Sequence, residues 1–131
     1  MSKLEELHTK AIEQMAEKLK TNPTCNRLFG DQVGIGTASA GLPRLTLTRG
    51  KLHGKDQQPG EPVKLVQADV RVKIEAATEE EFLTLAVAVQ VAVQTLAGQN
   101  AVKSVVLSDT GKPAEEEGVC QRTDVFAAFI S

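Results

Sequence analysis

Two histidines, two cysteines and a few clusters of glutamate are the residues of this chain that could do chemistry. Neither His8 nor His53 belongs to a recognisable set of metal ligands, so we expect both side chains in solvent. Cys25 and Cys120 form no C-x-x-C pair, and we expect free thiols in a reducing, cytosolic setting. These residues predict no metal, no cofactor and no catalytic centre, and therefore a protein that is not an enzyme.

Two weaker signals leave alternatives open. The stretch GIGTASAG, Gly34 to Gly41, is similar to a phosphate cradle, but such a loop must lead into a helix whose amide groups face the anion. This one leads into LPRLTLT, which favours a flexible crossing segment instead. Cys25 with a distant histidine remains an alternative nucleophile, against its commoner role as a small buried hydrophobe.

Composition and charge favour a structural protein. The net charge of −2 excludes a strongly basic nucleic-acid binder, and four Phe without Trp or Tyr provide few surfaces on which bases could stack. The charge is uneven, because residues 40–75 hold seven Lys/Arg against four Asp/Glu while residues 76–118 hold two against seven. No apolar run has bilayer-spanning character, so we expect no membrane role.

The first half of the chain predicts one helix and two strands. Leu4, Leu7, Ala11, Met15 and Leu19 recur at helical spacing, which predicts a helix over residues 3–21 that ends at Asn22-Pro23. Residues 23–41 read as irregular, and residues 44–49 alternate as a strand. Residues 50–62 hold three Gly and two Pro and predict a long hairpin loop, before a clearly alternating strand over 66–75.

The segment TEEEFLTLAVAVQVAVQTLAG, residues 78–98, predicts a second helix. Thr78 and Glu81 form a capping box, and Gly98 suits the position after a helix end. Val87 and Val91 fall on the side that a monomer would turn to water. Leaving them in water forgoes about 1.5–3 kcal/mol each, which favours a neighbouring subunit as their cover. The core stripe is expected to consist of Phe82, Leu85, Ala86, Val89, Val93 and Leu96.

The last third predicts two strands around an acidic loop. Residues 101–108 and 119–130 read as strands, and residues 109–118 as the loop between them. Glu79 to Glu81 have a local role, because acidic residues stabilise a helix N-terminus. Glu115, Glu116 and Glu117 are either a solvated charge run or part of a binding surface. The order α-β-β-α-β-β predicts an α+β fold, with two helices on an antiparallel or mixed sheet of four or more strands, in one domain over residues 1–131.

This order of elements resembles the phage tail terminator proteins of the lambda minor tail protein U type. The resemblance covers nearly the whole chain: the leading helix, LPRLTLTRG, the polar loop, VQADVRVKIEAAT, the Thr/Glu-capped helix and the hairpin closing on TDVFAAFIS. It implies a ring, typically a hexamer, on the head-proximal end of a completed tail tube. Such a ring stops tube polymerisation and offers a surface to the neck. The implied location is the virion tail, after assembly in the host cytoplasm.

The resemblance implies three partners: further copies of the chain, the tail tube protein and a neck or connector protein. Sequence-specific nucleic acid is not expected, although DNA could pass through the ring lumen. A head–tail neck protein is the alternative within the same class, and a small cytosolic enzyme or ligand-binding domain is the alternative from another class. The candidate interface residues are Val87, Val91, Arg44, Arg49, Lys51, His53, Lys55, Arg71, Lys73, Glu115, Glu116 and Glu117.

Overall fold

A computed structural model describes residues 3–30, 32–38, 41–53, 66–96 and 102–130. Three helices and six strands follow one another along this part of the chain. Their order is α1 (Lys3–Thr21), α2 (Pro23–Phe29), β1 (Val33–Ile35), β2 (Arg44–His53), β3 (Val66–Ala76), α3 (Glu79–Gln94), β4 (Val102–Thr110), β5 (Ala114–Glu116) and β6 (Val119–Ile130).

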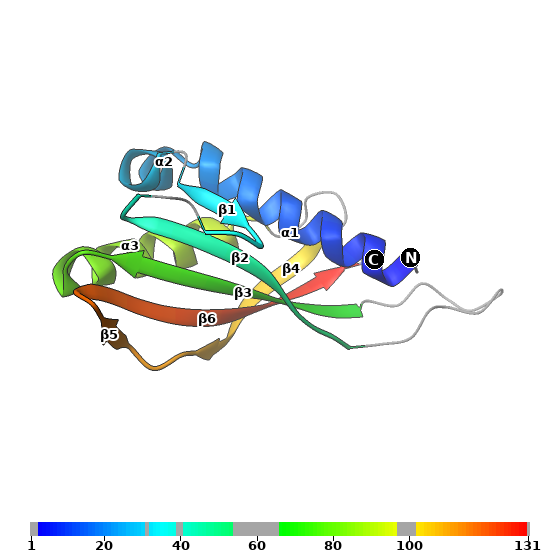
Figure 1. Cartoon of the computed structure of the whole chain (residues 1–131). Helices are drawn as coiled ribbons and strands as arrows, with labels where there is room; N and C mark the ends of the chain where they lie inside the picture. Colours follow the sequence, from blue (N-terminus) through cyan, green and yellow to red (C-terminus); the bar gives the residue numbers. More distant parts are fainter. Residues whose placement is uncertain (1–2, 31, 39–40, 54–65, 97–101, 131) are drawn as a thin grey trace, which may run out of the picture.

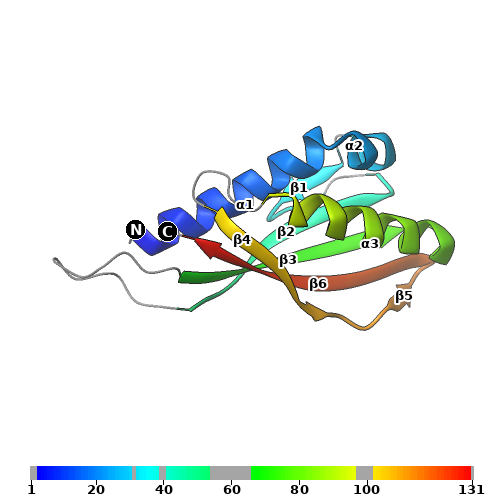
Figure 2. The ribbon, with the colours of Figure 1, turned by 180° about the vertical axis from the view of Figure 1, so that it is seen from behind.

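The strands form one mixed sheet, and the helices lie on one side of it (Figures 1 and 2). The strand order is β1-β2-β3-β6-β4, and β5 pairs with the first residues of β6. β1 is parallel to β2, whereas the other pairs are antiparallel. The predicted α+β class is confirmed. Because none of the described helices covers the other side of the sheet, we call that side the open face.

The core lies between the helices and the sheet. The alternation in β3 is as predicted, since Val66, Ala68, Val70, Val72 and Ile74 are all buried on the helix side. The register of β3 with β6 places Phe126, Ala128 and Ile130 on that same side. On α3 the predicted stripe is buried as well: Phe82, Leu85, Ala86, Val89, Val93 and, just beyond the helix, Leu96.

The two predicted helices form close to where the sequence placed them. α1 ends at Thr21, as expected. α3 begins after Thr78, whose hydroxyl oxygen accepts a hydrogen bond of 3.2 Å from the backbone N–H of Glu81. α3 ends at Gln94, earlier than predicted, and Gly98 lies outside the described residues.

The region after α1 differs from the prediction. The sequence predicted two helices in the chain and an irregular segment over residues 23–41, whereas this segment contains a third helix and a strand. The Asn22 side chain accepts hydrogen bonds from the backbone N–H groups of Thr24 and Cys25, each 3.1 Å long. Pro23 then occupies the first helical turn, where its missing N–H costs nothing. Asn22-Pro23 therefore ends one helix and also begins another, α2. The Gly-rich stretch after it contributes β1 to the edge of the sheet.

The acidic segment before β6 also departs from the prediction of a plain loop. Residues Ala114–Glu116 form β5, which pairs with residues 119–121 of β6 through a turn at Glu117 and Gly118. Both turn residues have positive φ, 52° and 80°. Gly111 separates β5 from β4, and a Cβ there would lie 2.2 Å from the backbone oxygen of Thr123. Only glycine fits that close approach to β6.

His8 contradicts the expectation of a solvated histidine, because it is only 1% exposed. A bulge at Gly50 and Lys51 interrupts the β2–β3 ladder opposite Asp69. The Asp69 carbonyl accepts a hydrogen bond of 2.8 Å from His8 Nε2, which must therefore carry the proton. Burial lowers the pKa of His8, against the raising effect of this hydrogen bond. His8 thus joins α1 to the centre of the sheet as a neutral donor.

Candidate interaction surfaces

The outward side of α3 is an exposed apolar stripe. Val87 and Val91 are 64% and 57% exposed, so they face away from the core as the sequence indicated. Leu83, one turn earlier, is 55% exposed and extends the stripe. The helical wheel could have shown Leu83, because it stands four residues before Val87. We call these three residues the α3 stripe.

The α3 stripe is also free of neighbouring charge along the helix. No charged residue occurs between Glu81 and the end of α3 at Gln94, and the other exposed residues after the first turn are Thr84 and Gln94. Exposed single apolar residues are common on monomers, but an uncharged exposed helix side with three aliphatic residues in line is typical of a surface that becomes covered.

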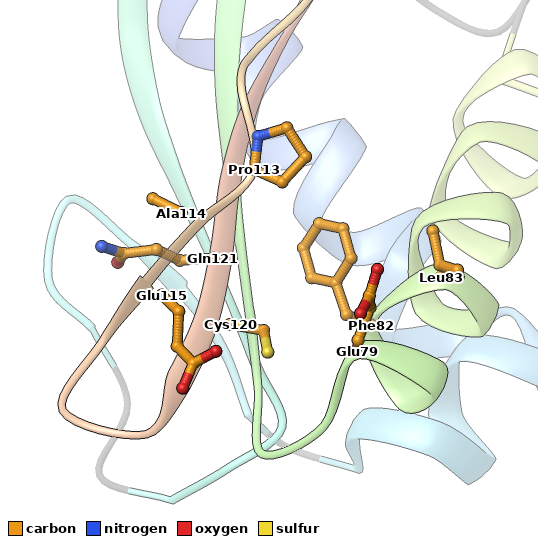
Figure 3. Close-up of a pocket in the computed structure, with 8 residues that line it drawn as sticks. All are labelled: Glu79, Phe82, Leu83, Pro113, Ala114, Glu115, Cys120 and Gln121. Atoms are coloured by element: carbon orange, nitrogen blue, oxygen red, sulfur yellow. The ribbon is translucent and has the colours of Figure 1, made fainter.

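A shallow hollow of about 240 Å³ continues the α3 stripe at its N-terminal end (Figure 3). The Phe82 ring of α3 points toward Pro113, and Leu83 of α3 and Cys120 and Gln121 of β6 also line the hollow. Glu79 and Glu115 stand at its rim. The lining of the hollow is mixed, with apolar residues beside Gln121 and the two glutamates, and Leu83 belongs both to it and to the stripe.

An ion pair of β6, Arg122 with Asp124, stabilises the wall of this hollow. Arg122 donates to both carboxylate oxygens of Asp124, through Nε at 2.7 Å and Nη2 at 2.9 Å. Its guanidinium also lies 5.2 Å from the centre of the Phe82 ring, within cation–π range. Asp124 is buried among the core residues, so Arg122 neutralises a carboxylate that would otherwise be costly to bury.

The open face of the sheet has a polar half and an apolar half. By the strand register, Gln67, Asp69, Arg71, Lys73 and Glu75 of β3 point to this side. Beside them on β6 stand Thr123, Val125, Ala127 and Phe129, and Val106 of β4 pairs with Ala127. Val106 is 48% exposed, and Val125 and Phe129 are half-buried.

Arg44 and Glu75 form an ion pair with two hydrogen bonds on the open face. Arg44 Nε donates to Glu75 Oε1 at 2.9 Å and Nη2 donates to Oε2 at 2.7 Å. The Arg44 guanidinium lowers the pKa of the buried Glu75 carboxyl, and Lys73 contributes in the same direction. Arg44 was a candidate interface residue, but the structure shows its charge used within the subunit.

The other basic candidates lie apart from one another. His53 contacts Asp69 Oδ2 at 3.1 Å on the open face, and Gln67 donates to the same carboxylate. Arg49 instead points to the helix side and donates to the Thr9 hydroxyl of α1. Lys51 is exposed at the bulge, and Lys55 lies outside the described residues.

The acidic candidates and the remaining basic ones are exposed. Glu115 and Glu116 lie on β5, with Glu117 in the turn after them, all exposed. Arg71 is exposed and Lys73 half-buried on the open face. The structure therefore brings Arg71 and Lys73 together, and separately Glu115 to Glu117, but it does not unite all the candidates in one patch.

No group of three or more His, Cys, Asp or Glu among the described residues could hold a metal ion. Cys25 is fully buried, its thiol lies 3.6 Å from the Ala88 carbonyl, and burial raises its pKa. The helices described here are too short or too polar to cross a bilayer.

Comparison with known proteins gives a match of fold. No family model and no curated protein matches the sequence. A chain in the solved structure titled "Virion of native gene transfer agent (GTA) particle" has the same fold, with a TM-score of 0.65 and 15% identity over 88% of this chain and 90% of that one. A second solved structure, whose title states no function, has a TM-score of 0.57 and 11% identity over 100% and 96% of the two chains.

Proposed function

We propose that this protein is a virion structural protein of a phage or phage-like particle. In that role it forms a ring on the head-proximal end of the tail tube, stops tube polymerisation and presents a surface to the neck. The observation that carries the proposal is the shared fold with a chain of a gene transfer agent virion, which extends over nearly the full length of both chains. The order of elements that resembles the tail terminators is the second support.

The surfaces of the subunit suit an assembled protein. The α3 stripe lies on the helix side of the sheet, whereas the exposed Val106 lies on the open face. Apolar surface on two different sides of one subunit allows heterologous contacts, in which one patch meets a different patch of the next copy. Such contacts form a ring when the rotation between copies closes. We expect six copies, as in the terminators that the chain resembles.

Two neighbours are expected besides further copies. One rim of the ring contacts the last layer of tail tube protein, and the other contacts a neck or connector protein. The exposed acidic strand β5 and the end of β2, which carries the exposed Lys51, lie at different ends of the sheet, so the two rims can differ in charge (Figure 1). The contacts with tube and neck need not use the same residues as the contacts between copies.

Electron microscopy of tail tubes tests this function. Purified protein is mixed with polymerising tube protein from the same particle, and tube lengths and ends are imaged. We expect a ring on one end of each tube and no further growth at that end. A bovine serum albumin control should leave tubes growing. Tubes that lengthen normally in a stoichiometric excess of the protein would contradict capping, and a ring found only on isolated heads would favour the neck role.

A further inference from the structure

The open face and the α3 stripe match each other in length. Leu83 and Val91 are eight residues apart on α3, which separates them by roughly 12 Å at 1.5 Å per residue. On the open face, Val125 and Phe129 are four residues apart on β6, which separates them by roughly 14 Å. Ala127 lies between these two, flanked by the exposed Val106 of β4. Both surfaces are thus apolar strips of about the same length.

The charges at the ends of the two strips are opposite. Glu79 and Glu80 are exposed on the turn of α3 next to Leu83. On the open face, the register sets Arg71 beside Val125 and Lys73 beside Thr123, at one end of the apolar strip. The two carboxylates of β3 on this face have partners already, because Arg44 holds Glu75 while His53 and Gln67 hold Asp69. Arg71 and Lys73 therefore leave positive charge on the β3 side of the strip, whereas the exposed Asp109 of β4 lies on its other side, opposite Val125.

From this match we infer that α3 of one copy packs on the open face of the next copy. Leu83 then lies over Val125, Val91 over Phe129, and the glutamates of α3 over Arg71 and Lys73. In this arrangement the docked helix runs in the direction of β6, as the subunit's own α3 does on the opposite side of the sheet (Figure 2). The joint would cover the α3 stripe and the apolar strip of the open face with each other.

The joint specifies how the proposed ring is built, and in that sense it rests on the proposed function. Each subunit uses α3 toward one neighbour and the open face toward the other, so the contact is heterologous. An α3–α3 contact between two copies would instead be isologous and would stop at a dimer. Charge reversal distinguishes these two arrangements. In the proposed joint the charges of α3 face those of β3 in the next copy, whereas in an α3–α3 contact the charges of β3 take no part.

Two charge-reversed variants test the joint. The sheet variant carries Arg71→Glu and Lys73→Glu, and the helix variant carries Glu79→Lys and Glu80→Lys. In either variant alone, like charges face each other at every joint, which opposes assembly. In a mixture, the open face of each variant meets an oppositely charged helix of the other. The control variant carries Glu13→Lys and Glu17→Lys on the exposed side of α1, away from the joint.

Native mass spectrometry and sedimentation provide the readout, with circular dichroism to establish that each variant is folded. We expect wild type and control to assemble. Each reversed variant alone should need a protein concentration at least about 100-fold higher than wild type to assemble. The equimolar mixture should regain assembly, with the two variants alternating around the ring. Assembly of either reversed variant alone at wild-type affinity, or a mixture that stays dissociated, would overturn the joint and leave the ring intact. A wild type that stays monomeric, even with tail tubes, would overturn both the joint and the proposed function.

Discussion

Helices α1 and α3 lie on the same side of the same sheet, yet their outward sides differ completely. The exposed residues of α1 are almost all charged: Glu5, Glu6, Lys10, Glu13, Glu17 and Lys20. Beyond its first turn, α3 exposes Leu83, Val87 and Val91 and carries no charge. Both helices bury a full apolar side against the sheet, so the fold of the subunit does not require this difference. The joint proposed above would account for it, because that joint leaves α1 in water and covers α3.

The largest effect on assembly should come from lysines on the outward side of α3, whereas lysines at the same spacing on α1 should have little effect. Val87→Lys with Val91→Lys puts two charges, one turn apart, on the outward side of α3. The intramolecular core is untouched, so we expect a folded monomer whose assembly is lost, because each joint would bury unpaired charges. Analytical ultracentrifugation measures the loss.

The matched control is Glu13→Lys with Glu17→Lys, which places two lysines at the same spacing on α1. We expect it to assemble like wild type. Equal assembly by the α3 variant and by this control would show that the stripe is an ordinary solvent-exposed surface.

Two leucines of α3 allow a buried and an exposed side of one helix to be compared by their effect on the stability of the monomer. Leu85 is fully buried against the sheet, so Leu85→Ala should lower the free energy of unfolding by about 2–5 kcal/mol. Leu83 is exposed, so Leu83→Ala should change the stability of the monomer by less than about 0.5 kcal/mol. Denaturant unfolding at a concentration below assembly measures both. Similar losses for the two variants would mean that Leu83 packs within the subunit.

Loss of the Arg44–Glu75 ion pair should lower the free energy of unfolding more than loss of an exposed charge on the same face. Glu75→Gln removes the carboxylate that Arg44 grips with two hydrogen bonds, which should cost about 1–3 kcal/mol of stability. The lowered pKa of Glu75 gives the pH dependence its sign. The unfolded carboxyl takes up a proton as the pH falls through about 4.5 while the folded one does not, so the pair's contribution is present above that pH and is lost below it.

Urea unfolding of wild type and Glu75→Gln between pH 3 and pH 7 checks this contribution. The difference between the two proteins should shrink as the pH falls through the lowered pKa of Glu75. A difference that stays constant over this range would show that the ion pair does not set the acid sensitivity. Arg71→Gln is the matched exposed control, and at a protein concentration below assembly it should shift the stability of the monomer by less than about 0.5 kcal/mol.

His8 should produce the smallest effect, as a mild loss of stability in weak acid. Because burial lowers its pKa in the folded protein, the unfolded chain binds a proton first as the pH falls below about 6.5. The contribution of neutral His8 is therefore full above that pH and declines below it, until the folded histidine is also protonated. Arg49, close to His8, opposes its protonation further.

Thermal unfolding of wild type and His8→Gln between pH 5.0 and pH 7.5 measures this decline. Wild type should lose stability toward pH 5.0 more steeply than the variant. Parallel pH profiles of the two proteins would contradict a neutral buried His8.

Periodicity predicted the parts of the fold that depend on local sequence. Spacing along the sequence indicated the extent of α1, the buried side of β3, the Thr78 cap and the outward valines. It could do so because each of these elements buries only one of its sides in the core between the helices and the sheet. The role of Asn22-Pro23 was missed, because the same pair of residues can end one helix and cap another. β1 and β5 were missed since three-residue strands depend on their partner strand and have no period of their own.

The polar positions were less predictable because their partners are distant in sequence. The hydrogen bond from His8 to Asp69 spans 61 residues, and the Arg44–Glu75 pair spans 31. Only the strand register reveals that Arg44 is neutralised, that Arg49 faces α1, or that Arg71 and Lys73 stand beside the apolar strip of β6. The α3 stripe, in contrast, comes from one helix, and the sequence alone indicated it.

A density map of the assembled protein tests the central claim most directly. Cryo-electron microscopy of the ring, alone or on the end of a tail tube, shows what lies against the outward side of α3. Our account predicts density from a neighbouring copy over Leu83, Val87 and Val91, with the charged side of α1 left in solvent. A ring in which α3 faces solvent and the copies meet elsewhere would contradict it.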